Sequence, residues 1–270
     1  MSIRTIRKTA RFLAALGIAV TVGPLSAMAP SAYAAPPAKP AISEEASAAL
    51  AQMGKSLLAE QFSFRARTFR VYSASNGQPL HIAHAMKVTV RRPDRMMIDL
   101  TGDDGATKLY YNGKTVVIYG VETKKYVTTP APVSIQAMIE KNVGNGSLDF
   151  PLADFLTSAP DKSFLAGIKS GSEVTTVTID GVPCRHLLFT QSPGVEIELW
   201  VEKNERALPR RLVATWRSEP GQPSFIAEMY DWDLSIHPTD ADFTFQPPAG
   251  AVQTEAKIPT PAPAPKGARP

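Results

Sequence analysis

The chain has a single cysteine, Cys184, among its 270 residues. One cysteine cannot form a disulfide within the chain, so stability must come from a buried core, which a chain of this length can build. Nor can Cys184 be the acylated first residue of a bacterial lipoprotein, because it lies deep in the sequence. We therefore expect neither an internal disulfide nor a lipid anchor.

The sequence also lacks an apolar run of the roughly 20 residues that a bilayer-spanning helix needs. The apolar run that comes nearest, residues 12–22, is about half that length. It follows four basic residues without an acidic one, and small residues ending in Ala32-Tyr33-Ala34 come after it. This order is typical of a secretory signal peptide. We expect residues 1–34 to be removed after Ala34, leaving an exported, periplasmic protein that does not span the membrane.

There is little excess charge of either sign once this segment is removed. The chain has 29 basic and 25 acidic residues. Four of the basic residues lie within residues 1–34, so 29 − 4 = 25 remain against 25 acidic ones. Binding to nucleic acid depends on clustered Lys and Arg that meet phosphates. We therefore expect no nucleic-acid partner.

Catalytic and cofactor motifs are absent as well. The sequence has no Gly-x-Ser-x-Gly elbow, His-Glu-x-x-His helix, phosphate loop or dinucleotide fingerprint, and it predicts neither an enzyme nor a cofactor. Cys184 and His186 would share one face of a strand, which leaves a hydrolase as a minor alternative. His81 and His84 would face opposite sides, so they predict no metal site. We expect His84 to be a hydrogen-bonded residue lining an apolar face.

The remaining sequence predicts one folded domain over residues 42–250. Residues 35–41 form a Pro/Ala linker, and residues 251–270 form a Pro-rich tail with too few apolar groups to fold. Ser43 can cap a helix whose apolar residues recur at helical spacing, and short amphipathic pieces follow Pro132. Elsewhere apolar and polar residues alternate, as in residues 82–91 and 195–202.

Turn residues divide these alternating segments into antiparallel hairpins. Asn112-Gly113 and Asp180-Gly181 each sit between two such segments. The chain thus predicts an α+β, mainly β fold with about ten or eleven strands, a leading helix and a helical insert. In the strand from Phe62, the apolar phase slips between Ala66 and Phe69, which predicts a bulge there.

A sheet this large with few helices must close into a barrel or wrap around its helices. An antiparallel sheet curled round a few helices can leave an internal apolar hollow, which suits an acyl chain or another hydrophobic guest. Six methionines in the exported chain would suit a wall that accepts varied apolar shapes.

Three segments resemble the LolA/LolB-like superfamily of periplasmic lipoprotein carriers. They are Arg92-Pro93-Asp94-Arg95 leading into a strand, Tyr111-Asn112-Gly113-Lys114 leading to Tyr119, and Leu208-Pro209-Arg210-Arg211 through to Phe243-Thr244-Phe245-Gln246-Pro247-Pro248-Ala249-Gly250. The resemblance implies an unclosed antiparallel barrel with helices covering its concave face. It carries over none of the carrier's own binding or release residues.

We therefore expect a periplasmic protein that holds a lipid or a lipoprotein acyl group in the concave face of its sheet. The side chains that we expect to line the site are Met53, Leu57, Met86, Val88, Met138 and Phe155. The superfamily also includes a regulator of envelope stress, so a sensor module with an envelope protein partner is the alternative function.

Overall fold

The computed structural model describes residues 41–143 and 150–255. The expected signal peptide, nearly all of the expected linker and residues 256–270 lie outside the described residues. None of the helices in the described part of the chain is long and apolar enough to cross a membrane.

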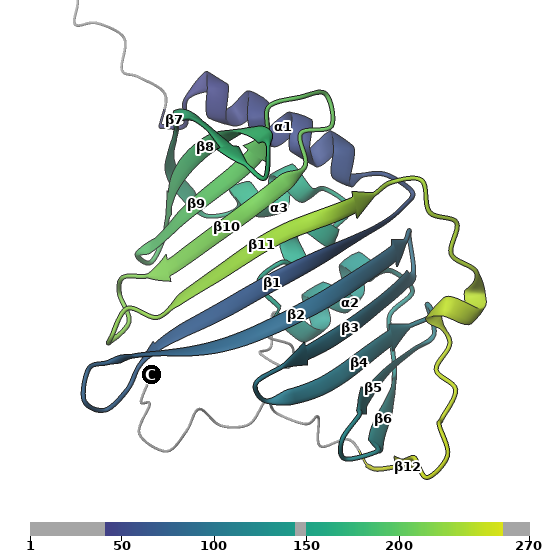
Figure 1. The fold of residues 1–270 in the computed structure, drawn as a ribbon. Helices are drawn as coiled ribbons and strands as arrows, with labels where there is room; N and C mark the ends of the chain where they lie inside the picture. The colour runs from purple at the N-terminus through teal and green to yellow at the C-terminus, as the bar shows by residue number, and fades with distance from the viewer. Residues whose placement is uncertain (1–40, 144–149, 256–270) are drawn as a thin grey trace, which may run out of the picture. The chain divides into compact units, whose positions relative to one another are not determined.

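The described residues form one twelve-stranded sheet, slightly larger than the ten or eleven strands expected (Figure 1). Its strands, in their order across the sheet, are β12 (Val252–Gln253), β6 (Lys125–Pro130), β5 (Thr115–Gly120), β4 (Gly105–Tyr111), β3 (Arg95–Gly102), β2 (Pro79–Arg91), β1 (Gln61–Ser73), β11 (Ser224–Asp233), β10 (Pro209–Trp216), β9 (Val195–Glu202), β8 (Val182–Gln191) and β7 (Ile168–Ile179). Neighbours are antiparallel except β12 and β6. The sheet is curved and unclosed, with β12 and β7 as its edges, which confirms the expected half-barrel.

The helices lie on one face of the sheet, which we call the concave face (Figure 1). They are α1 (Glu44–Leu57), α2 (Ile135–Val143), the short 3₁₀-helix η1 (Ala153–Leu156) and α3 (Pro160–Leu165). A second 3₁₀-helix, η2 (Asp240–Phe243), belongs to the C-terminal segment. Ser43 caps α1 as expected, because its Oγ accepts a hydrogen bond from the Ala46 N–H at 3.2 Å. The expected leading helix and helical insert are both confirmed.

The hydrophobic core lies between the concave face and the helices. Alternate residues of β1 and β2 point into it, and Phe62 and Phe64 stand directly opposite Val90 and Val88. The next strands continue the same face, since Ile98 stands opposite both Val88 and Leu109. The period-two pattern of the sequence therefore gives a continuous apolar wall.

The bulge expected between Ala66 and Phe69 is wrong. β1 pairs with β2 without a break from Gln61 to Ser73, and its irregularity against β11 lies earlier, between Ser63 and Arg65. Because the alternation continues unbroken, Thr68 and Arg70 keep the inward positions. Phe69 faces the opposite, convex side of the sheet. The apparent slip in the sequence thus marks polar residues on the concave face.

The C-terminal segment packs along the other side of β4, β5 and β6. The ring of Phe245 lies 5.0–5.5 Å from the rings of Tyr110, Tyr119 and Tyr126. Beyond it, β12 pairs in parallel with β6 and covers part of that edge. The folded region therefore continues beyond Gly250, the boundary expected from the sequence.

Candidate functional site

The structure places the six side chains expected to line the site in one buried apolar cluster. They come from four elements: Met53 and Leu57 from α1, Met86 and Val88 from β2, Met138 from α2 and Phe155 from η1. Met86 is the most accessible of them, with 9% of its surface exposed. The described structure thus has these six positions filled by tightly packed side chains.

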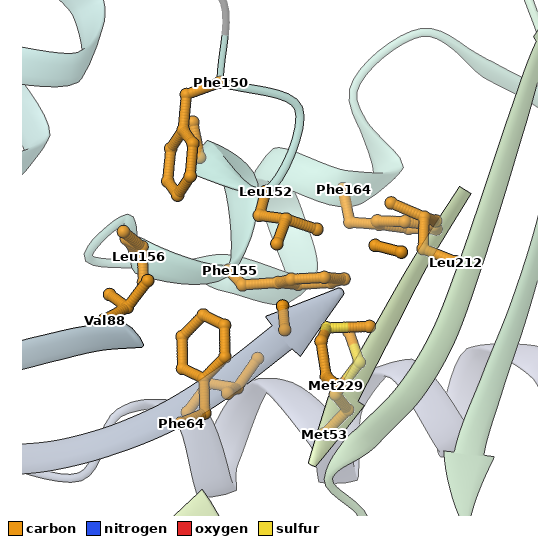
Figure 2. Packing of buried hydrophobic residues seen from close by; sticks show 14 of the residues in the cluster. Met53, Phe64, Val88, Phe150, Leu152, Phe155, Leu156, Phe164, Leu212 and Met229 are labelled. Atoms are coloured by element: carbon orange, nitrogen blue, oxygen red, sulfur yellow. The ribbon is translucent and has the colours of Figure 1, made fainter. Parts of the chain in front are cut away.

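Phe155 lies at the centre of this packing. Figure 2 shows its ring among Leu152, Phe164, Phe64 and Met229, which belong to the helical insert and to two central strands. The Phe155 and Phe164 rings are stacked with centroids 6.3 Å apart, and Phe164 meets Phe189 of β8 edge-on at 5.4 Å. The insert is therefore held on the sheet by rings and aliphatic groups.

Helix α1 lies close against α3 at Gly54. A Cβ atom on Gly54 would lie 2.7 Å from the Cβ of Asp161 and 3.1 Å from its backbone nitrogen. Real Cβ atoms do not pack this closely, so the glycine allows α3 to rest directly on α1. Together with α2 and η1, these two helices form what we call the helical cover of the concave face.

Arg92 fastens two parts of the helical cover to the turn after β2. Its Nη2 donates a hydrogen bond to the Leu57 carbonyl oxygen at 2.9 Å, and its Nη1 donates to the Leu156 carbonyl oxygen at 2.8 Å. Leu57 ends α1 and Leu156 ends η1, so the guanidinium meets the negative ends of both elements. The Arg92 Cζ also lies 5.8 Å from the centre of the Phe62 ring.

Burial lowers the pKa of Arg92, but an arginine remains charged at any physiological pH. Its Nε is buried without a hydrogen-bond partner in the described structure, which adds a cost to the closed arrangement. In the sequence, Arg92-Pro93 contributed only to the family resemblance, which implied no such role for the arginine. The sequence signal available was the pair Arg91-Arg92 directly before a proline at a strand end.

A second set of polar contacts positions α2. The Tyr111 hydroxyl donates to the Pro132 carbonyl oxygen at 2.6 Å, and the Ile135 N–H donates to the Pro93 carbonyl oxygen at 2.8 Å. Burial raises the pKa of Tyr111 to about 12, so the hydroxyl stays protonated and keeps donating. The start of α2 is thus tied to β4 and to the turn that carries Arg92.

His84 confirms the expectation of a hydrogen-bonded lining residue. It occupies an inward position of β2, its side chain is 9% exposed, and its Nε2 lies 2.7 Å from Asp104 Oδ1. His81 is exposed and three residues away on the same strand, so it faces the other side. Within the described ranges, no group of three or more metal-ligating side chains comes together.

The geometry around Cys184 and His186 does not assemble a nucleophile and its base. The His186 Nε2 lies 2.9 Å from Glu198 Oε2, and its ring stacks on Trp200 with centroids 4.2 Å apart. The Cys184 Sγ donates instead to the Val182 carbonyl oxygen at 3.4 Å. Burial raises the pKa of Cys184, which favours the thiol over the reactive thiolate.

A polar hollow of about 340 Å³ lies on the convex side of the sheet, away from the helical cover. Arg210 in its wall approaches Asp180 at 3.4 Å and Glu202 at 3.7 Å. Arg67 lies over the Tyr230 ring at 5.4 Å. Arg210 thus has two carboxylate partners within 4 Å, Asp180 at the surface and Glu202 in the interior.

The chain was compared with protein-family models and with curated proteins. The family model described as "Predicted periplasmic protein (DUF2092)" matches residues 46–256. The comparison with curated proteins finds no match.

Distant solved structures follow a similar chain path. The Mycobacterium tuberculosis lipoprotein LppX is 13% identical, with 72% of this chain and 99% of that chain covered and a TM-score of 0.43. A LolA superfamily protein from Nitrosomonas europaea is 13% identical, with 74% and 97% covered and a TM-score of 0.32. The Pseudomonas aeruginosa MucA/MucB complex gives 18% identity, 75% and 61% coverage and a TM-score of 0.41. Since the family model spans most of the sequence, the chain belongs to the DUF2092 family of predicted periplasmic proteins.

Proposed function

We propose that this protein is a periplasmic binding or carrier protein that holds the acyl chain of a lipid or lipoprotein between the concave face and the helical cover. The observation that carries the proposal is the construction of the cover. A continuous apolar wall is covered by separate short helices whose inward side chains are themselves apolar. The proposed lining residues are Met53, Leu57, Met86, Val88, Met138 and Phe155.

The cover is suited to being displaced. α2 has nine residues, η1 four and α3 six, and helices of these lengths have little stability apart from the surface on which they pack. An acyl chain gains about 0.8 kcal/mol for each methylene that it buries. When a guest replaces the insert, the free energy lost from the insert's apolar contacts is therefore similar to the free energy gained by burying the acyl chain. Such an exchange permits both capture and release.

Native mass spectrometry of the protein extracted from its own periplasm tests the proposal. We expect a co-purifying mass that organic extraction removes and that added palmitate restores. The repeated absence of lipid, together with no binding of palmitate, would overturn the proposal. A stoichiometric protein partner that survives delipidation would favour an interaction module instead.

A pair of variants locates the guest. Met86→Trp places an indole on the concave face, where it takes up the volume proposed for the acyl chain, and should weaken palmitate binding at least tenfold. Lys87→Trp places the same indole on the convex face and should leave binding unchanged. Equal effects of the two variants would contradict a site on the concave face.

A further inference from the structure

Strand β7 forms one edge of the sheet over its 12 residues, and the described part of the chain covers this edge only in places (Figure 1). The segment before α1 binds it at Gly171, whose N–H donates to the Ala41 carbonyl oxygen at 3.0 Å. The Ser43 N–H donates to the Gly171 carbonyl oxygen at 2.9 Å. Within residues 41–143 and 150–255, no backbone hydrogen bond reaches Val174–Ile179 from outside the sheet. We call Val174–Ile179 the free edge.

The pairing of β7 with β8 shows which backbone groups of the free edge point outward. In an antiparallel pair, positions that exchange hydrogen bonds alternate with positions whose N–H and C=O groups point away from each other. The Pro183 carbonyl oxygen accepts from the Lys203 N–H at 2.8 Å, on the far side of β8. Thr178 stands opposite Pro183, so its backbone groups point away from β8, and those of Thr176 do the same. Two N–H and two C=O groups are therefore open at this edge.

The side chains of the free edge favour pairing with another strand. Its sequence is Val-Thr-Thr-Val-Thr-Ile, which consists of β-branched residues without a charge. Proteins usually protect an exposed edge with charged residues or proline. Val174 is 53% exposed, and Leu188 on the neighbouring strand β8 is 39% exposed. Lys203 reaches this edge, but its Nζ donates to the Thr176 Oγ1 at 3.1 Å and so leaves the backbone groups open.

The free edge is complementary to itself. If two copies meet around a two-fold axis at Val177, Thr176 of each copy stands opposite Thr178 of the other. Each of these two Thr–Thr pairs can exchange two hydrogen bonds, so all the open backbone groups of both copies are used. In the same register, Thr175 meets Ile179 and Val174 meets Asp180. No charged side chain therefore stands opposite another.

The length of the free edge fits this register. A bulge between Glu173 and Thr175 ends the regular pairing on one side, and the turn at Asp180, where φ is 48°, ends it on the other. With Val177 on the axis, the turn of each copy lies opposite the bulge of the other. A shift by two residues would place Thr178 opposite the bulge or Thr176 opposite the turn. Because neither has regular strand geometry, hydrogen bonds would be lost.

We propose that β7 pairs with β7 of a second copy of this chain around a two-fold axis at Val177. The two sheets then continue into one another. One pair of strands buries less than the roughly 1,200–2,000 Å² of a stable complex, so the dimer is reversible and depends on protein concentration. The pairing uses none of the proposed lining residues and does not rest on the proposed function.

Sedimentation equilibrium of the protein purified from its own periplasm tests the proposal. We expect the average mass to rise from that of a monomer toward that of a dimer up to about 1 mM protein. Val177→Lys should weaken the dimer at least tenfold, because two like charges would stand directly opposite each other. Ser172→Lys is the matched control, since Ser172 is exposed on the same strand but lies outside the free edge. It should dimerise like the wild type.

A charge exchange tests the register. Val177→Asp alone should also stay monomeric, whereas an equal mixture of Val177→Asp and Val177→Lys should dimerise, because Asp then faces Lys. Thermal unfolding shows that each variant is folded. If the Val177 variants do not fold, Thr178→Pro replaces them. It removes an N–H that has no partner in the described monomer, and it should weaken the dimer as well.

Three results would overturn the proposal. The first is a wild type that stays monomeric up to about 1 mM. The second is a dimer that Val177→Lys and Ser172→Lys weaken equally, or that Thr178→Pro leaves unchanged. The third is a mixture of folded Val177→Asp and Val177→Lys that stays monomeric, because the two copies then do not meet at Val177.

Discussion

Arg92 is the residue on which the closed position of the helical cover most directly depends. Its two charge-assisted hydrogen bonds join α1 and η1 to the turn after β2. Arg92→Met keeps an apolar stem but removes both bonds and leaves two helix-terminal carbonyls without this donor. We expect the free energy of unfolding to fall by about 2–4 kcal/mol, measured by urea denaturation.

Arg217→Met is the control for this effect. Arg217 donates to Glu196 at 2.8 Å, but the two side chains are 49% and 51% exposed. An exposed ion pair of this kind contributes less than about 1 kcal/mol. Equal losses for the two arginine variants would show that Arg92 does not fasten the cover.

Tyr111 makes the stability of the cover depend on pH in alkaline solution. Its pKa is about 12 in the folded protein and 10.0 as the ordinary value, so the folded state holds the proton more tightly. The resulting stabilisation is complete below pH 10 and is lost as the pH rises from 10 to 12. Tyr111→Phe should remove this loss of stability between pH 10 and 12. It should also lower the free energy of unfolding by about 1 kcal/mol at neutral pH. Denaturant titrations from neutral pH to pH 12 measure both effects. If the free energy of unfolding of Tyr111→Phe falls between pH 10 and 12 as steeply as that of the wild type, Tyr111 is not the group responsible.

The sequence could predict that the proposed lining residues are buried, but it could not predict the roles of Arg92 and Tyr111. The apolar periodicity around Met53, Val88 and Phe155 indicates that these side chains are buried, and this periodicity depends only on local spacing. Arg92 instead meets backbone carbonyls 35 and 64 residues away, and a backbone acceptor leaves no mark in the sequence. Its role becomes visible only when the chain path brings the ends of α1 and η1 together.

At the scale of elements, α1 was predicted because the Ser43 cap and the apolar spacing agree. The insert was predicted only as short pieces after Pro132, and the start of its third helix, α3, at Pro160 was not predicted. Proline marks a possible first turn at each site. The helix that begins at Pro160 packs against Gly54 of α1, which lies far away in the sequence, and local spacing does not show such a contact.

The contact between α1 and α3 gives an element-scale prediction. In a solvent-exposed helix, Gly→Ala stabilises by up to about 1 kcal/mol. At Gly54 the added methyl group would meet the Cβ and backbone of Asp161, so Gly54→Ala should instead destabilise the protein by about 1–3 kcal/mol. Ser47→Ala, on the exposed side of the same helix, should be neutral or stabilising. Thermal unfolding measures both, and a stabilised Gly54→Ala would show that α3 does not press on α1.

The curvature of the sheet could be predicted at the scale of the whole molecule, because many strands and few helices leave few other arrangements. The sequence could not predict how fully the helices fill the concave face. Phe155 has the same sequence pattern whether it lines an open cavity or packs against Phe64 and Met229, as it does in Figure 2. That distinction depends on how the helical cover lies on the sheet, which local spacing in the sequence does not determine.

The proposed displacement of the cover gives the prediction for the molecule as a whole. Since the described interior is packed at the proposed lining positions, an acyl chain can enter only by displacing side chains of the cover. Palmitate should therefore raise the melting temperature, because it binds the folded state. It should also speed amide hydrogen exchange in residues 135–141 and 153–165 while leaving β1 and β11 protected. Met86→Trp should abolish both effects. Slower exchange throughout the cover would mean that the guest fits into space already present, and the displacement mechanism would then be wrong.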